Sequence, residues 1–86
     1  MKDFTYTITD PLGIHSRPAG LLAKTAKGYG DTTVTVTKDV STVKASQLMK
    51  LMGLGVKQGN TITVAAEGPA EDEAIAAMQK FFEENL

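Results

Sequence analysis

Apolar and polar residues alternate with a period of two along three stretches of the chain, as in strands with one buried face. These stretches are residues 4–9, 33–37 and 61–66. A weaker alternation over residues 40–43 predicts a further strand, joined to the one before it by a hairpin turn at Lys38 and Asp39. The pattern therefore predicts four strands.

Three other stretches repeat apolar residues every three or four positions, which is typical of helices. The first helix should begin near residues 15–17, because Pro18 is tolerated only in a first turn, and it should stop at Gly28. A short helix is predicted over residues 47–52, and a last one after Pro69. The apolar stripe of the last helix consists of Ala74, Ile75, Met78, Phe81 and Phe82.

The element order is β-α-β-β-α-β-α. The clean alternation of the strands predicts that one face of the sheet is exposed to solvent. We therefore expect an α+β open-faced sandwich, with a four-stranded antiparallel sheet covered on one face by three helices. Eighty-six residues leave room for one core, so residues 1–86 should form a single domain.

Composition narrows the possible chemistry. A net charge of −1 argues against nucleic-acid binding by bulk basicity. Without cysteine, the chain has no disulfides, thiolate metal sites or thiol catalysis, and its one histidine makes His15 the only site for imidazole chemistry. No targeting pattern or long apolar run is present, which favours a cytoplasmic protein without membrane insertion.

His15 lies where a turn meets the first helix, with Gly13 before it and Arg17 two residues after it. A helix start exposes unpaired N–H groups and a positive dipole end, which together favour anions. Neutral imidazole is nucleophilic near pH 7, and a phosphoryl group on it would face Arg17. A lone histidine at a helix start is also commonly a cap or a surface residue, so position alone does not identify a phosphocarrier.

The run Gly-Ile-His-Ser-Arg-Pro-Ala-Gly at residues 13–20 resembles the active-site signature Gly-[Leu/Ile]-His-x-Arg-Pro-Ala. That signature belongs to the histidine-containing phosphocarrier protein (HPr) family of the bacterial sugar phosphotransferase system. Residues 24–29, 51–59 and 65–68 are also similar to the family, and length and element order agree over the whole chain.

The resemblance implies that His15 accepts a phosphoryl group on Nδ1 from phosphorylated Enzyme I, which obtains it from phosphoenolpyruvate. His15 then passes the group to sugar-specific IIA components for sugar uptake. Arg17 and the backbone N–H groups of Ser16 and Arg17 would bind the phosphate. Such a protein is a carrier rather than a stand-alone enzyme, needs no metal or organic cofactor, and is expected to be a monomer.

The resemblance also implies a docking surface for protein partners on the first two helices. Exposed methionine suits a surface that fits several partners, and lysines would steer the chain toward acidic ones. Leu48 and Met49 could equally be core residues, and each lysine could be an ordinary solvated side chain. The matching positions are Gly20, Lys24, Lys27, Leu48, Met49 and Met52.

Many Gram-positive family members carry a serine at the start of the second helix that an HPr kinase/phosphorylase modifies. Ser46 is a candidate, yet counting back from Leu54 and Gly55 places the regulatory position on Gln47. We therefore prefer to interpret Ser46 as a helix cap.

Two other interpretations stay open on the sequence. One is a small α+β binding domain without phosphotransfer, although metal-carrier domains of this order usually present paired cysteines. The other is a family member that controls proteins rather than sugar uptake, with His15 used in the same way.

Overall fold

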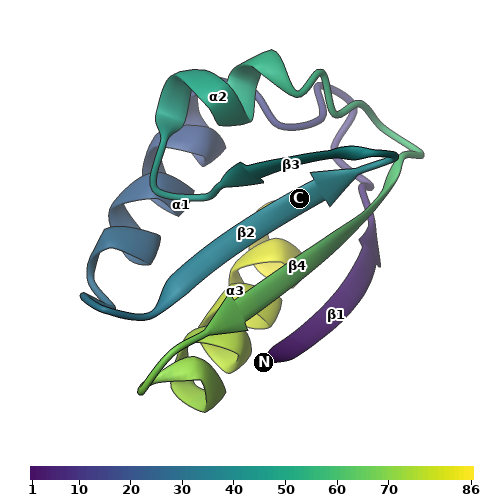
Figure 1. Cartoon of the computed structure of the whole chain (residues 1–86). Helices are drawn as coiled ribbons and strands as arrows, with labels where there is room; N and C mark the ends of the chain where they lie inside the picture. The colour runs from purple at the N-terminus through teal and green to yellow at the C-terminus, as the bar shows by residue number, and fades with distance from the viewer.

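Three helices cover one face of a four-stranded sheet in the computed structural model, which describes all residues 1–86 (Figure 1). The predicted element order and architecture are confirmed. The strands are β1 (Lys2–Thr7), β2 (Thr33–Lys38), β3 (Ser41–Lys44) and β4 (Thr61–Glu67). The helices are α1 (Ser16–Lys27), α2 (Leu48–Gly53) and α3 (Glu71–Asn85).

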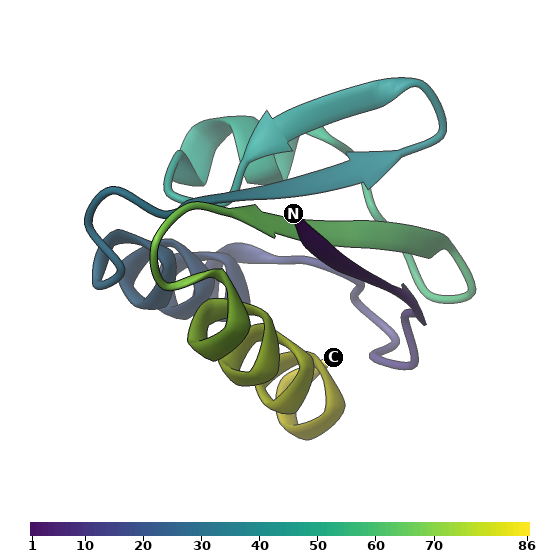
Figure 2. The same ribbon diagram turned by 60° about the horizontal axis from the view of Figure 1, so that its bottom comes forward.

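The sheet is antiparallel throughout, with strand order β1-β4-β2-β3. β4 therefore lies between β1 and β2, and Val64 pairs with Phe4 on one side and with Val36 on the other. α1 and α3 lie together under the sheet in Figure 2, and α2 packs against α1 and β3. The open face carries cross-strand threonine pairs, such as the Thr37 and Thr42 hydroxyls 2.8 Å apart.

The core fills the space between the sheet and the helices. Phe82 of α3 is its largest fully buried side chain, and its ring packs edge-to-face on Phe4, Tyr6 and Phe81 at centroid distances of 5.7–6.0 Å. One face of the strands and the inward stripes of the helices supply the rest, so the predicted periodicities located this core correctly. The other buried contributors include Ala19, Leu22, Val34, Val36, Leu51, Ile62, Val64, Ala74 and Met78.

The β2–β3 hairpin turns one residue later than predicted. Lys38 still pairs with Ser41, so the loop consists of Asp39 and Val40. Asp39 takes φ 56°, a left-handed conformation that aspartate tolerates better than most residues. Val40 at the tip is 98% exposed, so the apolar residue assigned to a strand by alternation belongs to the turn.

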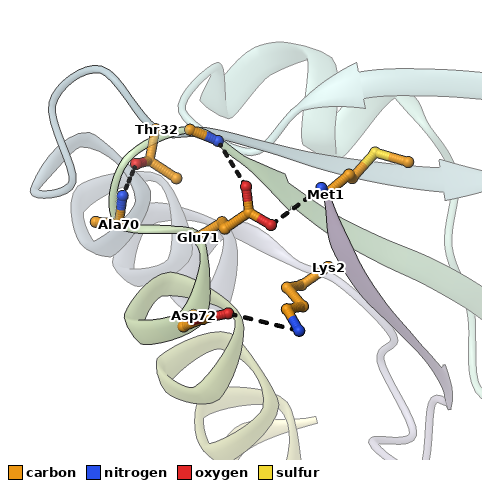
Figure 3. Close-up of polar contacts among 7 residues, drawn as sticks. Met1, Lys2, Thr32, Ala70, Glu71 and Asp72 are labelled. Atoms are coloured by element: carbon orange, nitrogen blue, oxygen red, sulfur yellow. Dashed lines mark hydrogen bonds and ion pairs between the residues drawn. The ribbon is translucent and has the colours of Figure 1, made fainter.

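The N-terminus of α3 is held against the start of β1 by a polar cluster (Figure 3). The Thr32 hydroxyl, itself buried, accepts the Ala70 N–H at 2.8 Å. One carboxylate oxygen of Glu71 lies 3.0 Å from the Met1 amino group, and the other accepts the Gly68 N–H at 3.4 Å. Interaction with that amino group, followed by the Gly68 bond, lowers the pKa of Glu71 below 4.5.

A depressed pKa in the folded state stabilises the fold above the unfolded value and loses that stabilisation as pH falls through the folded value. Glu71→Gln should therefore lower the free energy of unfolding at pH 7, and its difference from the parent should shrink as the pH falls below 4.5. Urea unfolding at pH 7, 5 and 3 measures this. Glu73→Gln, the same charge change at an exposed position of α3, is the control; an equal, pH-independent loss in both variants would contradict the assignment.

Candidate functional site

His15 occupies the N-cap position of α1. Its backbone is extended (φ −112°, ψ −179°), and its carbonyl accepts the Ala19 N–H at 2.9 Å. The imidazole makes no capping hydrogen bond, and 34% of the side chain is exposed. The backbone of His15 therefore starts the helix while its ring remains available, which argues against the capping alternative.

The first turn of α1 leaves donors free just beyond His15. The N–H groups of Ser16 and Arg17 have no acceptor in the protein, and Pro18 at the third position has no N–H. Two unpaired backbone donors thus stand at the positive end of a 12-residue helix. This arrangement can bind the oxygen atoms of an anion.

Arg17 supplies an exposed positive charge beside those donors. Its side chain is exposed and forms no ion pair or hydrogen bond within the protein. Arg17 and His15 both line a shallow hollow of about 160 Å³ at the surface. The other lining residues are Asp10, Pro18, Leu21 and Asn85.

Asp10 is the site residue that sequence reasoning missed, because its setting indicated only a turn. It does form that turn: Oδ1 accepts the Leu12 N–H at 2.8 Å, and the backbone oxygen accepts the Gly13 N–H at 3.0 Å. The same Oδ1 lies 3.8 Å from Nε2 of His15. The turn thereby aims a carboxylate at the imidazole, and no spacing rule in the sequence signals that contact.

Gly13 fits against the segment before β4. Its φ is +66°, and a Cβ there would lie 2.1 Å from the Val56 carbonyl oxygen and 2.7 Å from Lys57 Cα. The neighbouring Ile14 N–H donates to that Val56 oxygen at 3.1 Å. Only glycine allows this approach, so Gly13 fixes the position of the backbone two residues before His15.

The residues predicted for docking lie on the outside of α1 and α2. Leu48, Met49 and Met52 are 38, 77 and 40% exposed, so the core alternative for Leu48 and Met49 is wrong. Leu51 is the residue of α2 that enters the core. Of the positions on α1, Lys24 and Lys27 are exposed, and Gly20 is half-buried with open space where a Cβ would lie.

Leu21 belongs to the same outer surface and was missed. It is 45% exposed on α1 and also lines the hollow that contains His15. The sequence pattern assigned no role to Leu21, and the placement of α1 on the sheet shows that it faces outward.

Ser46 does not cap α2, so that prediction is wrong. The N-cap is Gln47, whose side chain makes no capping bond, and the helix begins at Leu48. Ser46 is half-buried one residue earlier, in a turn in which the Gln47 N–H donates to the Lys44 carbonyl. Because the turn continues past Ser46, its hydroxyl never reaches the free N–H groups of the first helical turn.

A family model described as the PTS HPr component phosphorylation site matches residues 2–84. The chain belongs to the HPr family. Membership makes it a phosphocarrier component of the phosphotransferase system. The phosphocarrier protein HPr of Mycoplasma genitalium is 36% identical over 85 residues, covering 99% of this chain and 97% of the relative. That of Vibrio cholerae is 41% identical over 68 residues, covering 79% of each.

Solved HPr structures share the fold. The crystal structure of HPr from Thermoanaerobacter tengcongensis matches with a TM-score of 0.91 at 40% identity, over 98% of this chain and 93% of that one. A Mycoplasma histidine-containing phosphocarrier protein matches with a TM-score of 0.92 at 31% identity, over 96% and 93%. In this HPr-family chain no helix has the length and apolar character needed to cross a bilayer.

Gly13→Ala should destabilise the protein by at least about 2 kcal/mol, because it combines a strained positive φ with a backbone clash. Gly20→Ala is the matched control: nothing lies within 4 Å of the added Cβ, and alanine favours a helix interior by about 0.5–1 kcal/mol. Urea denaturation of both variants measures the difference. Equal stability of the two variants would contradict the role given to Gly13.

Proposed function

We propose that the chain is a cytoplasmic carrier that receives a phosphoryl group on His15 from phosphorylated Enzyme I and delivers it to sugar-specific IIA components. Phosphoenolpyruvate is the original donor. One observation carries this proposal. The His15 imidazole makes no capping hydrogen bond, and the free N–H groups of Ser16 and Arg17 follow it directly in the chain.

The transfer needs only the groups at this site. The lone pair of Nδ1 attacks phosphorus while the bond from phosphorus to the donor's histidine nitrogen breaks, and its electrons return to the donor ring. The free N–H groups and the Arg17 guanidinium bind the phosphoryl oxygens. The same exchange in reverse order of partners passes the group on.

The exposure of the site supports a protein that passes its phosphoryl group on rather than one that stores it. His15 and Arg17 line a shallow hollow rather than an enclosed cavity, so a partner's histidine can approach the phosphorus directly. An anion held by two backbone donors and one exposed guanidinium is stabilised without being sealed from a second partner. Covalent relay through an accessible nucleophile fits this geometry.

The outer surface of α1 and α2 is the docking surface in this proposal. It combines the apolar side chains of Leu48, Met49 and Met52 with the positive charges of Lys24 and Lys27. Flexible methionine adapts to differently shaped partners, and the charges steer encounter with acidic ones. Both properties suit a monomer that binds two kinds of protein briefly.

An HPr kinase/phosphorylase is not among the partners that we propose. Gln47 stands at the N-cap of α2 and has no hydroxyl to phosphorylate. Ser46 is half-buried and one residue out of that position.

Incubation with phosphoenolpyruvate and Enzyme I should place one acid-labile, base-stable phosphate on each chain. His15→Ala should abolish the label, because no other imidazole exists. Arg17→Ala should label about 10–100-fold more slowly, because one charge-assisted phosphate contact is lost, while the far-ultraviolet circular dichroism stays unchanged. Normal labelling of the His15→Ala variant would refute the mechanism.

Met49→Glu should slow labelling by Enzyme I about tenfold or more, because it buries an unpaired charge in the docked complex. Val40→Glu is the matched control, since Val40 is also exposed and apolar but lies at the hairpin tip. Initial rates at limiting Enzyme I measure both. Equal rates for the two variants would contradict the assignment of Met49 to the docking surface.

A further inference from the structure

Asp10 places a carboxylate against the one imidazole nitrogen that the transfer does not use. Its Oδ1 is 3.8 Å from Nε2 of His15, and the side chains of Asp10 and His15 are 26 and 34% exposed. The backbone fixes this placement, because the same oxygen accepts the Leu12 N–H at 2.8 Å. The Asp10 N–H in turn donates to the Leu86 backbone oxygen at 2.9 Å, which ties the turn to the end of α3.

We propose that Asp10 is a positioning residue that keeps the proton on Nε2 of His15 throughout the phosphoryl cycle. This proposal rests on the proposed phosphorylation of His15. In the free protein, the carboxylate favours the tautomer with hydrogen on Nε2 and the lone pair on Nδ1. The ring therefore meets its donor with the nucleophilic nitrogen unprotonated.

The interaction strengthens once phosphorus is bound. Forming the Nδ1–P bond while hydrogen remains on Nε2 gives the ring a positive charge, and Asp10 then faces a cation rather than a neutral ring. When the Nδ1–P bond breaks toward the next acceptor, its electron pair neutralises the ring, which keeps the same proton. No proton has to enter or leave in either half of the cycle.

The charges around the ring favour this role for Asp10. In the hollow that holds His15, Asp10 is the only anionic residue and Arg17 the only other charged one. From the neighbouring elements, α1 contributes Pro18 and Leu21 and α3 contributes Asn85, all uncharged. The carboxyl group of Leu86 accepts the Thr9 and Asp10 N–H groups but does not line the hollow. Asp10 faces Nε2, the nitrogen on the far side of the ring from the phosphoryl site. Arg17 can therefore bind the phosphoryl oxygens while Asp10 interacts with the ring.

The test uses the whole chain phosphorylated with phosphoramidate, a small phosphorus–nitrogen donor that needs no protein partner. Asp10→Asn and Asp10→Ser each remove the charge but keep an oxygen that can accept the Leu12 N–H. Asp3→Asn, at an exposed position of β1, makes the same charge change away from the site. The measurements are the ³¹P NMR titration of the phosphorylated ring and the rate of phosphoryl exchange with Enzyme I.

Both Asp10 variants should lower the midpoint of the ³¹P titration by about 0.7 pH unit and slow exchange about fivefold, as expected for one charge about 4 Å away in water. Asp3→Asn should change neither. An unchanged midpoint in both Asp10 variants would overturn the inference, even if exchange slowed, because a turn-forming role alone would give that result. If phosphoramidate labels His15 of the parent and Enzyme I does not, the proposed function fails while the Asp10 inference is still decided by the titration.

Discussion

The close approach of Gly13 to the backbone of Val56 and Lys57 is the constraint on which the site depends. It joins the loop after β1 to the loop before β4, two segments distant in sequence. Neighbouring bonds strengthen the junction, since the Ile8 N–H donates to the Asn60 carbonyl and the Gly59 N–H to the Ile8 carbonyl. The start of α1, and with it His15, is therefore held by the sheet rather than by the helix alone.

The site balances binding against release. Two backbone donors and one unpaired guanidinium favour an anion, while the nearest carboxylate stands on the other side of the imidazole. Backbone donors cost no reorganisation when charge arrives, because the helix already aligns them. The side chains around them are exposed or half-buried, which leaves room for a second protein to approach.

Much of this could be predicted from the sequence, because the signals are local. Valines alternating with threonines show which face of a strand is buried, and Pro18 limits where α1 can begin. The two errors, the strand assignment of Val40 and the cap at Ser46, share a cause, because hydrogen bonding that the residue pattern does not show sets both turns. The outward position of Leu21 follows from the placement of α1 on the sheet. Asp10 escaped detection because a turn residue and a partner of an imidazole look identical in sequence.

The central place of β4 has a consequence for how the chain is built. β1 pairs with no strand except β4, which is the last strand along the sequence. During synthesis β1 therefore has no pairing partner, and its apolar face stays uncovered, until most of the chain has left the ribosome. Such long-range pairing raises contact order and slows folding relative to a helical domain of the same length. The sheet is therefore complete only after β4 has been synthesised and has paired with β1.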